Sequence, residues 1–226
     1  MKIAVLGTGT VGRALAGRLA ELGHEVSVGT RDVTATLART EPDRMGNPGY
    51  GGWAVEHPSV RLLPYAEVAD GAELVVNATS GEASIPALRA AGLDDRPGTV
   101  ILDVANPLDF SKGFPPTMTV KDTDSLAEQI QAAFPQARVV KALNTMTASL
   151  MVNPRQLADG DHSVFVSGND PEAKKIVAGL LESFGHTDVI DLGDITTARG
   201  AEMVLPLWLR LMGSLNNPIF NFKVVR

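Results

Sequence analysis

The first thirty-two residues constrain the fold more than any other stretch, because they combine a strand, a glycine-rich turn, a helix and a second strand. Lys2 to Leu6 is a short apolar run, long enough for a buried strand and too short for a core helix. A glycine-rich turn follows, and Val11 to Leu22 then carries apolar residues at helical spacing. Glu25 to Gly29 is predicted to be the second strand. This order is typical of a dinucleotide-binding βαβ unit.

The glycines of this turn have separate physical roles in such a unit. Gly7 permits the tight turn after the strand, Gly9 lets the backbone approach a pyrophosphate, and Gly12 allows close packing of the helix on the sheet. The pyrophosphate would lie on unpaired amide groups at the positive end of the helix. The residues expected to bind it are Gly7, Thr8, Gly9, Thr10, Val11 and Gly12. The alternative is a glycine turn that serves only packing.

The end of the second strand decides between NAD and NADP. An NAD site usually has an acidic residue there for the ribose 2′-hydroxyl, whereas a nearby arginine accommodates the 2′-phosphate of NADP. The chain has Thr30 at that position and Arg31 directly after it. A guanidinium offers a planar set of donors suited to phosphate, while Asp32 is better placed to cap the next helix. We therefore expect NADP(H); the alternative is that Arg31 is a solvated surface residue.

The rest of the chain alternates predicted strands and helices, which indicates an α/β fold. Further strands are predicted at 60–63, 73–78, 99–104, 138–143, 163–167 and 187–192. Helices are predicted at 33–40, 65–69, 84–91, 125–134, 171–184 and 197–215. The expected architecture is a Rossmann-type, doubly wound, mostly parallel sheet with a smaller C-terminal α/β extension. We expect an NADP-binding domain at 1–144 and a small domain at 145–226 that closes a cleft for a second cofactor.

Polar turn residues follow two of the predicted strands, at 79–81 and at 105–108. Because the carboxyl ends of parallel strands bind ligands in open α/β sheets, these two strand ends are expected to line the nicotinamide pocket. The residues expected to contact the cofactor there are Ala78, Thr79, Ser80, Ala105, Asn106 and Pro107. Thr79, Ser80, Asn106, Asn144 and Thr145 are candidates for neutral donors that orient the reacting rings. The alternative is that they are ordinary turn and cap residues.

Composition excludes several classes of function. The chain has 226 residues, no cysteine and a formal net charge of −6. The lack of cysteine removes disulfides and thiolate sites, and no metal site is expected. An acidic balance without a basic cluster argues against nucleic acid or an anionic membrane as partner. No apolar run is long enough to cross a membrane and none resembles a signal peptide, so a cytoplasmic location is expected.

Two segments are less regular. The stretch from 109 to 120 is predicted to be an irregular connection. The glycine-dense segment 45–59, whose glycines lie within 46–52, is expected to lack regular structure. The latter is either a surface connection or a flexible flap near the adenosine end of the cofactor. The last helix, 197–215, is apolar on nearly every side and must be buried, either on its own domain or in a dimer interface. A homodimer is therefore expected.

Taken together, these segments resemble a known family. The chain is similar over essentially its whole length to the NADPH-dependent coenzyme F420 reductases (F420H2:NADP oxidoreductases). The resemblance is carried by the glycine turn, Gly29-Thr30-Arg31, Val139 to Met146, Phe165 to Asp170, and the helix from Arg199 to Pro206. The cofactor half is common to many Rossmann enzymes, so the second half makes the resemblance specific. The same arrangement also resembles the NADPH–flavin domain of the STEAP ferric reductases.

The resemblance implies transfer of hydride between the nicotinamide of NADP(H) and the deazaflavin of F420 in an interdomain cleft. It implies that the 2′-phosphate end of NADP is bound by Thr8, Thr30 and Arg31. It also implies that the segment with Asn144, Met146 and Ala148 lies against the deazaflavin. Archaeal members have a histidine in place of Asn144 and a different turn at 106–108, so FAD, FMN or another flat acceptor is the alternative second cofactor.

Two rival functions remain open from the sequence. Lys141 lies on an otherwise apolar strand and could donate a proton to a carbonyl or imine, as in a carbonyl or imine reductase. A non-enzymatic, NADPH-binding redox sensor is the other. The four histidines are expected to be structural or solvated. Hydride transfer between two rings needs positioning more than acid–base chemistry, which favours the oxidoreductase.

Overall fold

A single eight-stranded sheet forms the centre of the computed structural model, which describes residues 1–42, 46 and 48–226. Its strand order is β10-β9-β8-β5-β4-β1-β2-β3. The part from β8 to β3 has the strand order of a dinucleotide-binding Rossmann sheet. From the central β1 the chain first adds β2 and β3 on one side and then β4, β5 and β8 on the other. The strands are β1 (Lys2–Leu6), β2 (Glu25–Thr30), β3 (Arg61–Pro64), β4 (Leu74–Asn77), β5 (Val100–Asp103), β8 (Arg138–Ala142), β9 (Ser163–Gly168) and β10 (Asp188–Gly193).

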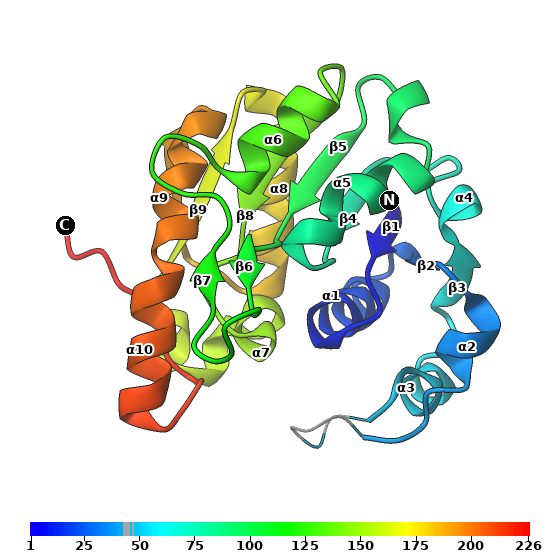
Figure 1. Ribbon diagram of the computed structural model, residues 1–226, viewed down its shortest axis with the longest axis horizontal. Coiled ribbons are helices and arrows are strands. Elements are labelled where there is room, and N and C mark those ends of the chain that lie inside the picture. The colour runs from blue at the N-terminus through cyan, green and yellow to red at the C-terminus, as the bar shows by residue number, and fades with distance from the viewer. Residues whose placement is uncertain (43–45, 47) are drawn as a thin grey trace.

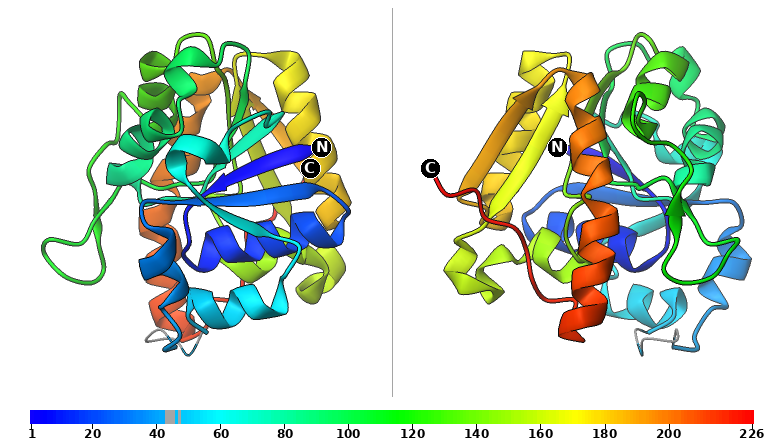
Figure 2. Two further views of the ribbon diagram at one scale, coloured as in Figure 1. Left: turned by 90° about the vertical axis from the view of Figure 1, so that its right-hand side faces the viewer. Right: turned by 60° about the vertical axis from the view of Figure 1, so that its left-hand side comes forward.

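Helices cover both faces of this sheet (Figures 1 and 2). The α-helices are α1 (Thr10–Glu21), α2 (Val33–Leu37), α3 (Tyr50–Glu56), α4 (Tyr65–Val68), α5 (Gly81–Ala90), α6 (Leu126–Ala133), α7 (Ala148–Val152), α8 (Pro171–Phe184), α9 (Ala198–Met203) and α10 (Leu205–Leu215). Short 3-10 helices lie at Leu93–Asp95, Pro154–Gln156, Ala158–Gly160 and Ile195–Thr197. The prediction of a doubly wound, mostly parallel α/β fold is confirmed.

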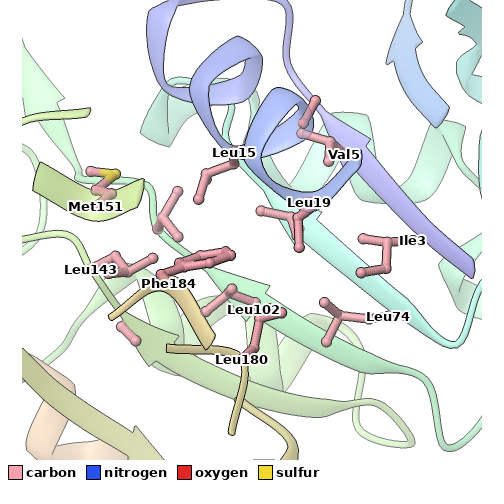
Figure 3. Packing of buried hydrophobic residues seen from close by; sticks show 14 of the residues in the cluster. Ile3, Val5, Leu15, Leu19, Leu74, Leu102, Leu143, Met151, Leu180 and Phe184 are labelled. Atoms are coloured by element: carbon pink, nitrogen blue, oxygen red, sulfur yellow. The ribbon is translucent and has the colours of Figure 1, made fainter. Parts of the chain in front are cut away.

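The sheet separates two hydrophobic cores, because successive side chains of a strand point to opposite faces. Ile3 and Val5 of β1 pack in one core with α1, α7 and α8, where Leu15, Met151 and Phe184 meet (Figure 3). Ala4 and Leu6 of the same strand pack in the other core with α4, α5 and α6. Each face of β1 is therefore fully covered, which fixes the position of the turn that follows the strand.

The C-terminal strands extend the same sheet. β9 runs antiparallel to β8, whereas β10 runs parallel to β9, and all other pairs in the sheet are parallel. The sheet is thus continuous across residues 144 and 145, where the second domain is predicted to begin. Outside the sheet this part contains α7, α8 and the pair α9 and α10, and that pair stands along one side of the molecule (Figure 2).

The glycine-dense segment was expected to lack regular structure, and for residues 50–56 that expectation is wrong, because α3 occupies them. Its glycines allow close packing. A Cβ atom at Gly49 would lie 2.2 Å from the carbonyl oxygen of Arg39, and one at Gly51 would lie 2.2 Å from that of Leu37. Met45 and Asn47, which belong to the same predicted stretch, lie outside the described residues.

Burial of aromatic side chains gives α3 its stability. Tyr50 and Trp53 are 3% and 8% exposed and belong to the core beneath α1. Burying two large aromatic side chains outweighs the roughly 1 kcal/mol that each helical glycine costs. The glycines therefore bring a short aromatic helix close to its neighbour, and tertiary packing overrides local propensity.

Two other predictions need correction. The segment 109–120 is not wholly irregular, because β6 (Leu108–Asp109) and β7 (Thr117–Met118) form a small antiparallel hairpin beside the main sheet. The last helix is divided at Val204 into α9 and α10, and α10 is not buried on nearly every side. Leu209 of α10 is buried, whereas Leu207 is 54% exposed. One apolar face of α10 is thus packed on the protein, and a second apolar face is exposed.

Candidate functional site

The glycine turn after β1 leaves no room for side chains at two of its positions. Gly7 has a φ of +122°, and a Cβ atom there would lie 2.3 Å from the carbonyl oxygen of Ala78. A Cβ atom at Gly12 would lie 2.0 Å from the carbonyl oxygen of Gly7. At Gly9 a Cβ atom would meet no heavy atom within 4 Å. Gly7 and Gly12 therefore hold the turn together, while the backbone at Gly9 faces open space.

The N-terminus of α1 is suited to an anion. Gly9 is its N-cap and makes no side-chain capping bond, and the first turn contains no acidic residue. The amide groups of this turn carry the positive end of the helix dipole and are oriented toward the open space at Gly9. Uncapped amides and free space together fit a pyrophosphate.

A cavity of about 560 Å³ lies beside this turn, and we call it the central cavity. Val11 of α1 and the residues that follow β4 and β5 form one side, while α7 and α10 contribute Met151 and Trp208 to the other. The predicted site residues that line it are Val11, Ala78, Thr79, Ser80, Ala105, Asn106, Asn144 and Met146. The sequence thus identified most of one wall.

Several predicted site residues do not line the central cavity. Thr145 and Ala148 are buried and are not part of its lining. Pro107 is not part of the lining either, although the next residue, Leu108, is. The sequence analysis missed the apolar wall formed by Met151, Leu205 and Trp208, and also Phe110 of the hairpin. The apolar character of α10 was the available signal, but nothing local shows which of its residues turn toward the strand ends.

Asn106 and Asn144 form a reciprocal pair at the edge of the central cavity. The Asn144 Nδ2 group donates to Asn106 Oδ1 at 3.0 Å, and Asn106 Nδ2 donates to the Asn144 carbonyl oxygen at 2.9 Å. Asn144 Nδ2 also donates to the carbonyl oxygen of Ala201 in α9 at 3.0 Å. These bonds tie the ends of β5 and β8 to the C-terminal helices and fix both amide groups.

The hydroxyl of Thr79 is oriented from behind. Thr79 Oγ1 donates to Asn77 Oδ1 at 2.7 Å, and Asn77 Nδ2 donates to Asp103 Oδ1 at 2.8 Å. Asn77 and Asp103 are fully buried at the ends of β4 and β5. Because its proton is committed to Asn77, the Thr79 hydroxyl presents an acceptor to the cavity.

A buried ion cluster lies beneath the same wall. The ammonium of Lys141 is 2.8 Å from both Asp103 Oδ2 and Glu202 Oε1, and it also donates to the carbonyl oxygen of Ala105 at 2.5 Å. Glu202 in turn accepts from the backbone amides of Leu126 and Ala127 at the start of α6. The cluster therefore joins β5, β8, α6 and α9.

The cluster argues against Lys141 as a proton donor to substrate. Its side chain is fully buried and does not line the central cavity. Burial alone would lower the pKa of Lys141, but the Asp103 and Glu202 carboxylates outweigh burial and raise it. A lysine with a raised pKa, held by two carboxylates out of reach of the cavity, supports structure rather than acid catalysis. The carbonyl or imine reductase alternative is therefore rejected on geometry.

Two further cavities flank the glycine turn. The Arg31 cavity, of about 490 Å³, is lined by Arg31, Tyr65, Thr79 and the apolar face of α5. The Arg39 cavity, of about 410 Å³, is lined by Arg13, Arg39 and Tyr50. Thr8 and Gly9 belong to both cavities. The turn thus separates two compartments, each with at least one guanidinium.

Thr30 is placed differently from Arg31. Its side chain is 6% exposed, and its hydroxyl is 2.8 Å from that of Thr36 in α2. Asp32 caps α2 by accepting from the Ala35 amide at 2.9 Å, as expected. Contact of Thr30 with a cofactor phosphate stays a prediction, whereas Arg31 is exposed and lines a cavity beside the turn.

The described part of the chain lacks two other classes of feature. No group of three or more histidine and acidic side chains there is arranged to hold a metal ion. None of its helices combines the length and the apolar character needed to cross a membrane. The four histidines all lie outside the lining of the central cavity.

Comparison with known proteins gives consistent results. Residues 2–107 match the family model for NADP oxidoreductase, coenzyme F420-dependent. A crystal structure of a candidate F420-dependent NADP reductase from Arthrobacter sp. FB24 is 65% identical, with a TM-score of 0.95 and full coverage of both chains. The F420-dependent NADP reductase of Methanocaldococcus jannaschii is 26% identical over 93% of this chain and 92% of its own length.

A further relative is the rat metalloreductase STEAP3, which is 28% identical over 92% of this chain. The chain spans only 38% of the length of that protein. The resemblance identified from the sequence, and with it the prediction of an NADP-linked oxidoreductase, is confirmed at the level of the family. The chain belongs to the coenzyme F420-dependent NADP oxidoreductases.

Proposed function

We propose that this protein transfers hydride between NADP(H) and coenzyme F420 within the central cavity. The observation that carries the proposal is that this cavity has two unlike walls. One wall consists of Val11 at the start of α1 and the polar residues that follow β4 and β5, and the other of apolar residues that follow residue 144. This supports a cofactor-binding part at 1–144 and a part at 145–226 that closes over a second cofactor.

The residues of the chain bind, orient and exclude water in this reaction. When bound, NADP(H) and F420 supply the hydride chemistry themselves, so the protein contributes positioning. The α1 N-terminus would hold the pyrophosphate, and the nicotinamide ring would face Thr79, Ala105 and Asn106. Met146, Leu205 and Trp208 offer an apolar surface on which a flat ring can stack.

The polar groups of the cavity fit a reaction without an acid catalyst. Asp109 lies on the rim, and a hydrogen bond from the Ser111 amide lowers the pKa of its carboxyl group, so it stays ionised. Glu82 is also on the rim and exposed. The remaining polar side chains of the wall, Thr79, Asn106 and Asn144, are neutral and fixed by hydrogen bonds. Neutral, fixed groups suit the binding of ring edges and amides.

The rival functions have less support. The matched family and the relatives at 65% and 26% identity are F420-dependent, so F420 is favoured over FAD and FMN as the second cofactor. A non-catalytic redox sensor would need one nucleotide and no second apolar wall. The exposed apolar residues of α10, including Leu207 and Leu215, are consistent with the predicted homodimer, which stays a prediction.

The proposal is tested by mixing the purified protein with NADPH and oxidised F420 and following the absorbance of the deazaflavin and nicotinamide bands. We expect both bands to fall together with equal stoichiometry, and only slow change with FMN, FAD or a panel of ketones. Tight binding of NADPH with no turnover of F420 would support the sensor. Turnover of flavin but not of F420 would overturn the assignment of the second cofactor.

A further inference from the structure

Arg39 is a basic residue beside the glycine turn that the sequence analysis did not single out. It follows α2, and its Nη2 group donates to Thr8 Oγ1 at 2.6 Å. Thr8 is the residue of the turn that the family resemblance connects with the 2′-phosphate of NADP. A guanidinium is therefore already hydrogen-bonded to a candidate phosphate ligand before any phosphate arrives.

Arg31 and Arg39 approach Thr8 from different compartments. Arg31 lines one of the two flanking cavities and Arg39 lines the other, while Thr8 and Gly9 belong to both. Thr8 therefore lies between the two compartments, with one of these arginines in the lining of each. Two guanidinium groups, each with a planar set of donors, can bind separate oxygens of one phosphate dianion.

The lining of the two cavities differs in chemistry. The Arg31 cavity has a wall of small apolar residues from α5, namely Ala83, Pro86, Ala87 and Ala90, and Tyr65 lies near its mouth. Such a slot fits a flat, uncharged ring such as adenine. Among the described residues that line it, the Arg39 cavity has two arginines, Arg13 and Arg39, and one carboxylate, that of the exposed Glu41. Its charge favours the phosphate.

Tyr50 completes the basic cavity as a neutral donor. Its side chain lines the Arg39 cavity and is almost fully buried in α3. Burial raises the pKa of Tyr50 to about 12, although Arg39 and Arg13 nearby act in the opposite direction. The phenol therefore keeps its proton at neutral pH and adds no negative charge near the phosphate.

We propose that Arg39 is a specificity-determining residue, which binds the 2′-phosphate of NADP(H) across Thr8 from Arg31. In this arrangement Arg31 lies beside the adenine slot and binds the same phosphate from the Arg31 cavity, while Arg39 binds it from the Arg39 cavity. The inference rests on the proposed use of NADP(H), and it assigns the preference for the phosphorylated cofactor to a residue outside the strand–turn motif.

The test compares Arg39→Ala, Arg39→Lys and Arg31→Ala by titration with NADPH and NADH. Loss of a charge-assisted hydrogen bond predicts an NADPH dissociation constant that rises on the order of tenfold to a hundredfold in Arg39→Ala. The dissociation constant for NADH should stay within about twofold. Arg39→Lys should recover part of the loss, because it restores the charge but not the planar donors.

Arg61→Ala is the matched control, because Arg61 is an exposed arginine whose partner is Glu25 on the neighbouring strand at 2.8 Å. It should leave both cofactors unaffected. Adenosine 2′,5′-bisphosphate and adenosine 5′-phosphate serve as short probes, and only the first should lose affinity in Arg39→Ala. Thermal unfolding of each variant confirms that the fold is retained.

Equal weakening of NADPH and NADH, or no weakening of either, overturns the role of Arg39. If wild-type protein still reduces F420 with NADPH in that case, the proposed function stands without this residue. If wild-type protein binds neither NADPH nor the bisphosphate, the proposed function itself fails. The two failures are therefore distinguishable.

Discussion

The glycine turn and the buried ion cluster support the same cavity by opposite means. The turn uses backbone alone, and two of its positions exclude any side chain because carbonyl oxygens lie where a Cβ atom would be. The cluster uses long charged side chains, with Lys141 bonded to residues from a neighbouring strand and a distant helix. The turn is formed by residues adjacent in sequence, whereas the cluster joins residues more than sixty positions apart, such as Lys141 and Glu202.

The difference explains why the two regions tolerate change differently. A backbone-built turn carries no titratable group, so its shape is insensitive to pH and fails only when a side chain is forced into it. A cluster of buried charges is stable only while every member is paired, because an unpaired charge in a protein interior is costly. Substitutions in the two regions should therefore differ in how much stability and cofactor affinity they remove.

Lys141→Met should cause the largest loss. It leaves the Asp103 and Glu202 carboxylates buried without their ammonium, which is expected to lower the free energy of unfolding by about 3–5 kcal/mol. Chemical denaturation at neutral pH measures this. Lys175→Met is the matched control, since Lys175 pairs with Glu172 at the surface, and we expect no measurable change. A similar small effect in both variants would mean that the cluster is not the charged core described above.

Gly12→Ala should destabilise the fold, whereas Gly9→Ala should not. The methyl group at position 12 would collide with the backbone of Gly7, which is expected to cost about 3 kcal/mol of unfolding free energy. At position 9 it meets nothing, so stability should be unchanged, yet the methyl group would occupy the space needed by the pyrophosphate. Denaturation and NADPH titration of both variants separate the two roles. Unimpaired NADPH binding by Gly9→Ala would contradict the placement of the pyrophosphate.

Arg31→Ala tests a side chain at the margin of the turn. Removal of its guanidinium should weaken NADPH binding by roughly 1.5–3 kcal/mol, the range for a hydrogen bond to a charged group. NADH binding should change little, because NADH lacks the 2′-phosphate. Isothermal titration with each cofactor measures the difference. An equal loss for both would show that Arg31 acts on a part shared by the two dinucleotides.

His186, a buried residue outside the ion cluster, makes the stability of the protein sensitive to pH. It is buried, its Nε2 is 3.0 Å from the Met151 carbonyl oxygen, and burial lowers its pKa from 6.5 to about 4. The unfolded chain therefore binds a proton more readily, so stability is lost as pH falls from about 6.5 toward about 4. Between about pH 8 and about pH 5 the loss should be about 2 kcal/mol.

Urea denaturation across this pH range measures the effect of His186. The variant His186→Gln should show a flatter dependence, because its amide does not titrate. Met151 also lines the central cavity, so the bond from His186 connects this pH response to the apolar wall. If wild-type protein and variant show the same slope, another group is responsible.

The sequence predicted well those parts of the molecule that depend on neighbouring residues. The βαβ unit, the cap at Asp32 and the polar residues that follow β4 and β5 are local features, and each lies where it was expected. The alternation of predicted strands and helices also predicted the doubly wound, mostly parallel sheet.

The remaining features depend on contacts between distant segments. α3 forms despite its glycines because Tyr50 and Trp53 are buried beneath α1. Lys141 appeared to be a candidate acid because its partner Glu202 lies sixty-one positions further along the chain. Arg39 donates to Thr8, thirty-one positions away, and its carbonyl oxygen accepts from the Gly51 amide of α3. No local pattern encodes these distances, so the sequence alone could not reveal them.

The two tryptophans of the chain occupy contrasting environments, which gives the protein a built-in optical reporter. Trp208 borders the central cavity, whereas Trp53 is packed against His57 in the N-terminal half. Emission from Trp208 should be quenched by energy transfer when a reduced nicotinamide or a deazaflavin enters, while Trp53 supplies a steadier background. A Trp53→Phe protein would thus allow stopped-flow fluorescence to follow the order in which the two cofactors arrive, without any attached dye.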